Sequence, residues 1–215
     1  MKTSLCRVLP TLVILATLFP YCPPAAAETH AVQPAGRIAG KWVAEPASVA
    51  AYLTSILLPV SAQCEWFGGN LIYKFIPGGT SPAGVPMSTM EIQLDAGIVH
   101  LTKGRSGPGP ADRISFAMNL AYAAPYTIHA DGQLLEFGTP SPDASSASIE
   151  NLMVNDVEVM RESGSADMLG LDMPFTATQM RFEFLGDDCL QLTPIFPPAP
   201  DGVSIVPTPL TFRRQ

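Results

Sequence analysis

The sequence is poor in charge and in histidine, and each shortage removes a class of function. Only 14% of the 215 residues are charged, and acidic residues outnumber basic ones by 19 to 12. Nucleic acids and anionic membrane surfaces require a basic protein surface, so we expect neither as a partner. The histidines, His30, His100 and His129, show no metal-ligand spacing, and we expect them in ordinary surface or linker positions.

Catalytic motifs are also lacking. Residues 104–107 read Gly-Arg-Ser-Gly and are similar to a nucleophile elbow, but Pro108 takes the place of the last glycine and no helix is predicted to follow. The acidic pair Asp187 and Asp188 fits a hairpin turn better than a metal or catalytic site, because aspartate favours turns. We therefore predict no catalytic residue, no metal and no cofactor.

Long apolar runs are missing except at the N-terminus. There, Lys2 and Arg7 flank the start of an apolar stretch over residues 9–19, and residues 25–27 are three alanines of the kind that signal peptidase requires. The stretch is shorter than the roughly 20 residues that cross a bilayer as a helix. Residues 1–27 are therefore predicted to be a cleaved signal peptide, and no membrane span is expected.

Cleavage before Glu28 would make the protein periplasmic or secreted. A lipid anchor on Cys22 is the alternative, but the bulky Tyr21 stands where a lipobox needs a small residue. Without Lys2 and Arg7 the chain keeps ten basic and 19 acidic residues, a formal charge of −9. That balance is ordinary for an exported soluble protein.

Cysteine is scarce too, since only Cys64 and Cys189 remain after cleavage. In an oxidising compartment we expect these two to form a disulfide, which would close most of the domain into one loop. The alternative is two separate buried thiols. A zinc site is not expected, because neither cysteine has a CxxC neighbour or a nearby histidine.

What the sequence does contain is repeated alternation of apolar and polar residues, which is typical of half-buried β-strands. Residues 180–192 and 126–137 each read as a hairpin, with Asp-Asp and Asp-Gly turns. Eight to ten such strands predict a mainly β fold, an antiparallel barrel closed around an apolar interior. The strands are expected within residues 37–44, 71–76, 87–95, 98–103, 113–121, 126–137, 149–160, 180–192 and 210–213.

One amphipathic helix is predicted directly after the first strand. Pro46 fits the first turn of a helix, and apolar side chains follow at helical spacing until Pro59. Residues 28–36 are interpreted as a linker and residues 37–215 as a single barrel domain with a proline-rich C-terminal segment. We expect residues 210–213 of that segment to return to the sheet.

Seven residues are candidates for the lining of a ligand pocket, because they fall on the inward faces of the predicted strands. Methionine is prominent among the inward positions, and its flexible thioether suits an adaptable apolar pocket. A plain packed core fits the same pattern, and the sequence does not separate the two interpretations. The seven are Met90, Ile92, Phe116, Met118, Ile128, Phe182 and Phe184.

Residues 40–42, Gly-Lys-Trp, resemble the GxW signature of lipocalins and the wider calycin superfamily. The pattern at residues 126–137, the strand pair around residues 187–188 and the closing Thr-Phe-Arg at residues 211–213 are similar to bacterial lipocalin-like exported domains. The resemblance implies an antiparallel barrel with a central apolar cup. It also implies that Arg213, or failing that Arg214, packs over the GxW tryptophan and closes the barrel.

The resemblance leaves more than one function open. Many lipocalin-like proteins carry small hydrophobic ligands, so a small apolar ligand in the barrel is our first expectation. The alternative is a protein-binding module, an inhibitor or assembly factor, acting through Gly/Pro/Ser-rich loops at residues 78–86, 104–111 and 139–148. An enzyme is the third hypothesis, for which no residue speaks.

Overall fold

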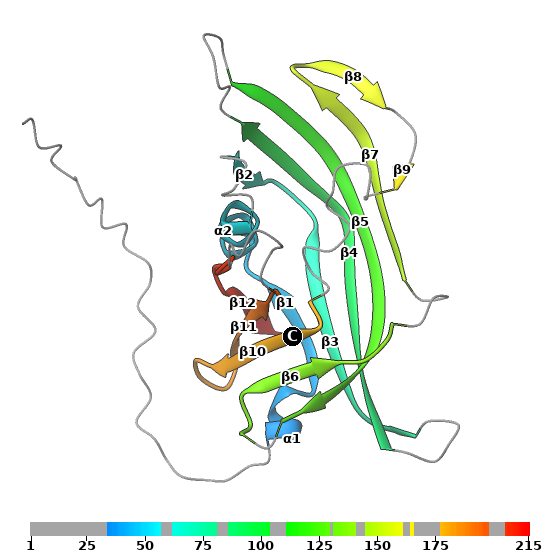
Figure 1. Cartoon of the computed structure of the whole chain (residues 1–215), viewed down its shortest axis with the longest axis vertical. Helices are drawn as coiled ribbons and strands as arrows, with labels where there is room; N and C mark the ends of the chain where they lie inside the picture. The colour runs from blue at the N-terminus through cyan, green and yellow to red at the C-terminus, as the bar shows by residue number, and fades with distance from the viewer. Residues whose placement is uncertain are drawn as a thin grey trace, which may run out of the picture.

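The chain forms one large antiparallel sheet that closes on itself as a barrel (Figure 1). The computed structural model describes residues 34–56, 62–80, 86–103, 111–129, 131–140, 145–160, 164–165, 177–197 and 205–215. The elements are α1 (Pro34–Ile38), β1 (Gly40–Ala44), α2 (Pro46–Ile56), β2 (Ala62–Trp66), β3 (Asn70–Thr80), β4 (Pro86–Lys103), β5 (Asp112–Ile128), β6 (Leu134–Phe137), β7 (Ser146–Val154), β8 (Val157–Met160), β9 (Gly164–Ser165), β10 (Gln179–Phe184), β11 (Cys189–Ile195) and β12 (Leu210–Arg214).

Eight strands make up the closed barrel. Their order around the wall is β4, β3, β1, β12, β11, β10, β6 and β5, and the pairing of β4 with β5 closes the ring. Closure satisfies the backbone groups that an open sheet would leave at its edges. The predicted mainly β, antiparallel barrel is confirmed, as is the return of the C-terminal segment, since β12 inserts between β1 and β11.

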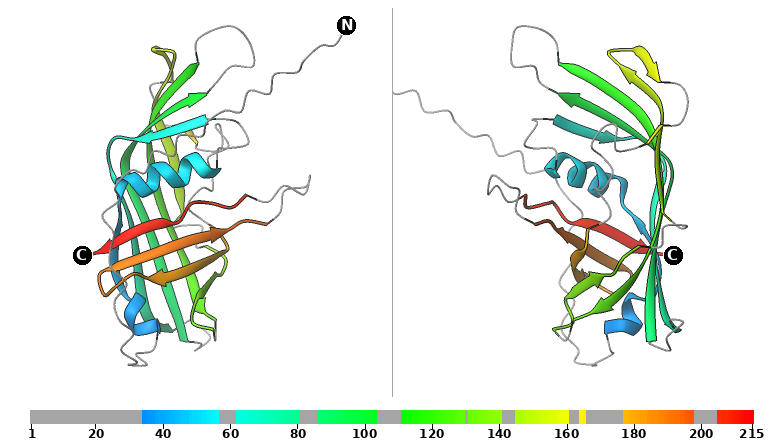
Figure 2. Two further views of the ribbon diagram at one scale, coloured as in Figure 1. Left: turned by 90° about the vertical axis from the view of Figure 1, so that its left-hand side faces the viewer. Right: turned by 45° about the vertical axis from the view of Figure 1, so that its right-hand side comes forward.

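Two strands run past the barrel and carry an extension. β4 has 18 residues and β5 has 17. Their far halves pair with β2 and β7 instead of with β3 and β6, while β8 and β9 pair with β7. Figures 1 and 2 show this extension curving beyond the barrel, with α2 on its concave side.

A β-bulge in β4 marks the point where the extension begins. The sequence predicts two strands, over residues 87–95 and 98–103, joined by a turn at Asp-Ala-Gly 95–97. This is wrong, because β4 continues through these residues. Ala96 takes a positive φ of 47°, and the register against β5 shifts between Leu94 and Gly97, as an inserted residue requires. The backbone N–H of Ala96 donates to Asn119 Oδ1 at 2.7 Å, so the bulge leaves this amide satisfied.

Both predicted hairpins, β5–β6 and β10–β11, are present. An unpredicted hairpin appears where the sequence predicts a single strand over residues 149–160. There β7 and β8 pair across Asn155 and Asp156, which have φ values of 51° and 65°. Two successive positive φ angles are the geometry of a tight two-residue hairpin turn, and Asn and Asp tolerate them.

The two described helices flank β1. α2 is the predicted helix, with Pro46 in its first turn and its apolar face buried. α1 is a single turn formed by residues that were predicted as linker and strand, so β1 begins at Gly40 and not at residue 37. In the described part of the chain, neither helix is long and apolar enough to cross a membrane.

One continuous apolar core fills the barrel and runs on into the extension. Its largest fully buried side chains include Trp42, Tyr52, Tyr73, Phe75 and Phe212. Each fully buried apolar side chain stabilises the fold by roughly 1.5–3 kcal/mol relative to an exposed one. The core therefore holds barrel and extension together as one unit.

Candidate functional site

The seven candidate pocket residues divide between the barrel and the extension. They share the inward face of the sheet, but the bulge in β4 separates them into two regions. The barrel holds Met90, Ile92, Ile128, Phe182 and Phe184, and the extension holds Phe116 and Met118.

Inside the barrel, aromatic rings pack on one another. The ring centroids of Tyr73 and Phe212 are 4.9 Å apart, and those of Phe75 and Tyr126 are 5.3 Å apart. These are ordinary packing distances for aromatic pairs. Met90, which lies opposite Phe75 on the neighbouring strand, is 1% exposed. This part of the interior is a packed core.

The inward face of the extension continues the same buried apolar core, and we call it the concave wall. α2 lies on the same side of the sheet (Figure 2). The Trp66 ring also lies there, because a Cβ added at Gly97 would be 2.5 Å from its Cη2 atom. The wall consists of Cys64, Val99, Leu101, Phe116, Met118, Ile149 and Leu152, each at most 9% exposed.

One end of the barrel is closed by an arginine stacked on a tryptophan, and we call this end the floor. The guanidinium carbon of Arg214 lies 4.5 Å from the Trp42 ring centroid, and the same guanidinium donates to the backbone carbonyl of Arg37. The indole N–H of Trp42 donates to the carbonyl of Ile38 at 2.7 Å. The floor therefore fixes α1 to the last strand.

Arg214 fills the role that the resemblance assigned first to Arg213. The preference for Arg213 is wrong, because strand alternation puts Arg214 on the inward face with Phe212 and turns Arg213 outward. There Arg213 Nε lies 2.7 Å from a carboxylate oxygen of Glu45. The second choice of the sequence prediction, Arg214, is confirmed.

The floor is also fastened to the β10–β11 hairpin. The guanidinium of Arg37 lies 4.3 Å from the Phe184 ring centroid and donates to the carbonyl of Gly186 at 3.1 Å. It also lies 3.4 Å from the carboxylate of Asp187. Phe184 in turn is 6.2 Å from the Trp42 ring. One candidate pocket residue, Phe184, therefore belongs to the floor.

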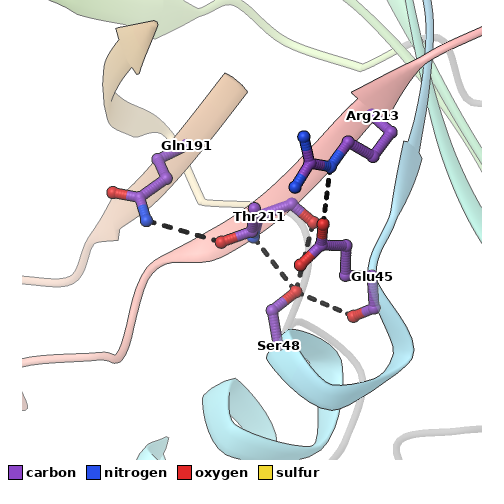
Figure 3. A network of polar contacts seen from close by, with 5 residues as sticks. All are labelled: Glu45, Ser48, Gln191, Thr211 and Arg213. Carbon is purple, nitrogen blue, oxygen red and sulfur yellow. Dashed lines mark hydrogen bonds and ion pairs between the residues drawn. The ribbon is translucent and has the colours of Figure 1, made fainter. Parts of the chain in front are cut away.

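At the opposite end of β1, the first turn of α2 is hydrogen-bonded to β12 (Figure 3). Ser48 Oγ accepts from the Thr211 amide at 3.0 Å and donates to the Glu45 carbonyl at 2.8 Å. Figure 3 also shows Gln191 donating to Thr211 Oγ1 and Arg213 reaching the Glu45 carboxylate. This network fixes where α2 starts relative to the last strand.

The last turn of α2 is fastened as well. Ser55 Oγ, a buried polar group, accepts from the Thr208 amide at 2.8 Å and donates to the Tyr52 carbonyl at 2.6 Å. Thr54 Oγ1 accepts from the Cys64 amide at 3.0 Å and so joins α2 to the edge strand β2. α2 is therefore held between the C-terminal segment and the extension.

Three tyrosines gather where the barrel meets the concave wall. The strand register places Tyr73 and Tyr122 on either side of Ile92, and Tyr52 comes from the buried face of α2. Burial raises the pKa of all three phenols, and the nearby Tyr52 and Tyr122 raise the pKa of Tyr73 further. The three phenols are therefore uncharged at neutral pH.

The expected disulfide between Cys64 and Cys189 is not formed. Cys64 lies on β2 opposite Leu101, while Cys189 lies on β11 opposite Arg213, and these two strands are not neighbours. A disulfide needs α-carbons within about 7 Å. Both thiols are buried, and burial, aided by the negative charge of Glu65, raises the pKa of Cys64 to about 12.

Two grooves lie among the described strands. One, of about 530 Å³, lies against β10 and β11, and its lining combines polar side chains such as Arg181 and Glu183 with Phe182 and Phe184, two of the seven candidates. The other, of about 360 Å³, includes Glu65, His100 and Ser115, which lie opposite one another on adjacent strands. No hydrogen bond joins these three within the described structure, so they do not form an assembled catalytic triad.

The remaining sequence predictions fall into two groups. His100 and His129 are exposed, and His129 pairs with Glu136 at 3.0 Å. Residues 1–33, residues 104–110 and parts of the other two loops lie outside the described residues, so the signal peptide and the loop-binding hypothesis stay predictions. Among described residues, no three His, Cys, Asp or Glu side chains cluster to hold a metal ion.

Sequence reasoning missed the tyrosine cluster and the division of the interior. Tyr73 and Tyr122 occupy ordinary inward positions of alternating strands, and Tyr52 an ordinary apolar face of a helix. Only the pairing of β3, β4 and β5 brings them together. Comparison with known proteins finds no match to this chain, whether among family models, curated proteins or solved structures.

Proposed function

We propose that the protein is an exported, lipocalin-like binding protein that holds a small apolar ligand between the concave wall and α2. The observation that carries the proposal is the continuity of one apolar face from the barrel core onto the wall, where β4 and β5 outrun the barrel. The Arg214–Trp42 floor supports the lipocalin-like assignment, because it matches the arrangement that the resemblance implies.

The ligand is assigned to the wall and not to the barrel centre. The barrel centre is occupied by aromatic rings in contact, such as Tyr73 and Phe212. The floor, built on Trp42, blocks the α1 end. Entry is therefore expected from the α2 side. Phe116 and Met118 are proposed as ligand contacts because they lie in the extension, and Met90 and Ile92 are assigned to packing because they lie in the barrel; all four are buried to a similar extent.

The test is a titration of the mature protein with an apolar fluorescent probe, using tryptophan emission as the readout. The chain has two tryptophans, Trp42 in the floor and Trp66 beside the wall. Probe binding should quench Trp66, and Trp66→Phe should remove most of the signal. If quenching persists unchanged in Trp66→Phe, the ligand does not lie at the wall.

A matched pair of substitutions separates binding from folding. Met118→Gln places an amide on the wall, and Met90→Gln places the same amide in the packed barrel. An amide without a partner in an apolar site costs about 1–3 kcal/mol, so Met118→Gln should weaken probe binding about tenfold or more. Met90→Gln should lower stability and leave the probe affinity of the folded protein unchanged. Equal effects of both variants on binding would contradict the proposal.

A further inference from the structure

We propose that the groove of about 530 Å³ against β10 binds the carboxyl terminus of an extended peptide. The last residues of the peptide would lie parallel to the end of β10, bonded to the backbone of Phe184, with the terminal carboxylate at Arg37. The groove volume lies within the range of roughly 300–1,000 Å³ that is typical of small-ligand sites. The groove is separate from the concave wall, so this inference does not depend on the ligand proposed there.

Phe184, the last residue of β10, has an open backbone edge. The next amide, that of Leu185, donates to the Cys189 carbonyl of β11, and only alternate residues of a strand bond to the same neighbour. Phe184 therefore turns its N–H and C=O toward the β6 side. The last bond described on that side runs from the Phe182 amide to the Gln133 carbonyl. Within the described structure, the N–H and C=O of Phe184 bond to no other group.

The fold covers the comparable edge position on β2. Cys64 turns its N–H and C=O away from β4, and the Thr54 hydroxyl of α2 bonds to both. The hydroxyl accepts from the amide at 3.0 Å and donates to the carbonyl at 3.4 Å. Among the described residues, no side chain does the same for Phe184. An uncovered strand edge is a template for another extended chain, and the open position on β10 therefore favours a peptide.

Along the direction of β10, the groove presents a donor, an acceptor and a cation in that order. The N–H of Phe184 comes first and its C=O second. Arg37 follows, because its Nη2 donates to the carbonyl of Gly186, two residues farther along the chain. A peptide carboxyl terminus that runs parallel to β10 presents the complementary series of a carbonyl, an N–H and a carboxylate. A simple organic acid lacks the amide, and an internal peptide segment lacks the carboxylate.

The charges of the groove also favour an anion. Two of the lining residues are cationic, Arg37 and Arg181, and one is anionic, Glu183. The Nη2 of Arg37 is engaged by Gly186 and by the fully exposed Asp187, at 3.1 and 3.4 Å. Its Nε and Nη1 donors bond to no described group, so they are available to a carboxylate, for which a guanidinium is well suited.

The test is a fluorescence-polarisation titration with fluorescein-labelled Gly-Ala-Leu-Ala in three forms: the free acid, the carboxamide, and the free acid N-methylated at its last residue. We expect the free acid to bind about tenfold or more tightly than the carboxamide, which lacks the charge. It should bind about fivefold more tightly than the N-methyl form, which cannot donate to the Phe184 carbonyl. Equal affinities of acid and carboxamide, or no binding of the acid, overturn the proposal and leave the proposed function standing.

A competition experiment distinguishes a peptide from a simple organic acid. Unlabelled Gly-Ala-Leu-Ala should displace the labelled free acid, and 4-methylpentanoate, which has a carboxylate but no amide, should compete at least about fivefold more weakly. Equal competition by the two would show that the carboxylate alone is recognised, and would overturn the assignment to a peptide.

A pair of neighbouring substitutions assigns the carboxylate to Arg37. Asp187→Asn removes a carboxylate that competes for Arg37, so it should strengthen binding of the free acid about twofold and leave the carboxamide unchanged. Asp188→Asn is the matched control, because it removes the same charge one residue away and no ion pair joins Asp188 to a described cation. It should change neither affinity. Equal strengthening in both variants, or in neither, contradicts the role of Arg37.

Discussion

Two glycines, Gly69 and Gly97, lie against each other at the β4 bulge, where a side chain would not fit. Gly69 has a φ of 76°, and a Cβ added to it would lie 2.7 Å from the Cα of Gly97. Both the conformation and the contact exclude a side chain, and the contact is with backbone that cannot turn aside. Gly69 thereby lets the β2–β3 connection cross closely against the bulge.

Gly69→Ala is therefore expected to lower the free energy of unfolding by at least about 2 kcal/mol, the sum of a left-handed residue and an overpacked contact. The control is Gly36→Ala, since a Cβ there meets nothing within 4 Å and Gly36 lies in a helix, where alanine is favoured. Urea denaturation measures both. A Gly69→Ala protein as stable as Gly36→Ala would contradict the close approach.

The two arginines at the end of β12 make a second contrast between neighbours. Arg214→Ala removes the stack on Trp42 and the hydrogen bond to the Arg37 carbonyl, and should cost about 1–3 kcal/mol. Arg213→Ala removes a half-exposed pair with Glu45, which is worth about 0–1 kcal/mol. The urea midpoint should be highest for the wild type, lower for Arg213→Ala and lowest for Arg214→Ala. If Arg213→Ala were the less stable of the two variants, the claim that the stack of Arg214 on Trp42 stabilises the floor would be contradicted.

At the scale of elements, α2 is fastened to the C-terminal segment through two serine hydroxyls. Ser48 and Ser55 each accept a backbone amide of the C-terminal segment, from Thr211 and Thr208. Replacing either serine by alanine leaves the amide of a part-buried hydrogen bond without its protein acceptor, which costs about 1–3 kcal/mol.

Ser48→Ala and Ser55→Ala should therefore lower stability by that amount and speed hydrogen exchange at Thr211 and Thr208 respectively. Ser146→Ala, at an exposed position of β7, is the control and should change neither. Exchange measured by NMR resolves the two amides. Unchanged protection of both in the double variant Ser48→Ala/Ser55→Ala would show that α2 is held by packing alone.

Strand existence and facing could be predicted from the sequence, but strand continuity could not. Alternation identified the inward residues on both sides of residues 95–97, yet Asp-Ala-Gly was interpreted as a turn, because a bulge and a turn use the same small or polar residues. A bulge and a turn at Ala96 would both change which alternate residues face inward, so alternation alone does not distinguish them. What decides between them is the hydrogen bond from Ala96 to Asn119, a contact 23 positions away that no local pattern reveals.

At the scale of the whole molecule, the sequence predicted only part of the arrangement of the candidate site residues. Alternation predicted that Phe116 and Met118 face inward. It did not predict that they lie apart from Met90, because that depends on β4 and β5 extending beyond the barrel. The disulfide between Cys64 and Cys189 was predicted from an oxidising compartment and from the presence of two cysteines after cleavage. Neither observation says how far apart the two residues lie in the fold. Strand order places the two cysteines on strands that do not pair.

The buried tyrosines give the whole molecule a defined alkaline limit. Their pKa values are raised in the folded chain, while in the unfolded chain they return to about 10. Above that pH the unfolded chain holds fewer protons than the folded one, so stability, complete below about pH 10, falls as pH rises. The slope is about 1.4 kcal/mol per pH unit for each such phenol. Urea midpoints across this range should fall less steeply in Tyr73→Phe than in wild type, and equal slopes would contradict the burial of Tyr73.

The central claim is the proposal that a small apolar molecule is held between the concave wall and α2. Native mass spectrometry of the protein, purified without detergent, tests it most directly. The account predicts a species heavier than the polypeptide by the mass of one small molecule, which is released on denaturation and extracts into organic solvent. A protein that shows only the polypeptide mass and takes up none of the offered apolar ligands, or one whose added mass is a second protein, would contradict it.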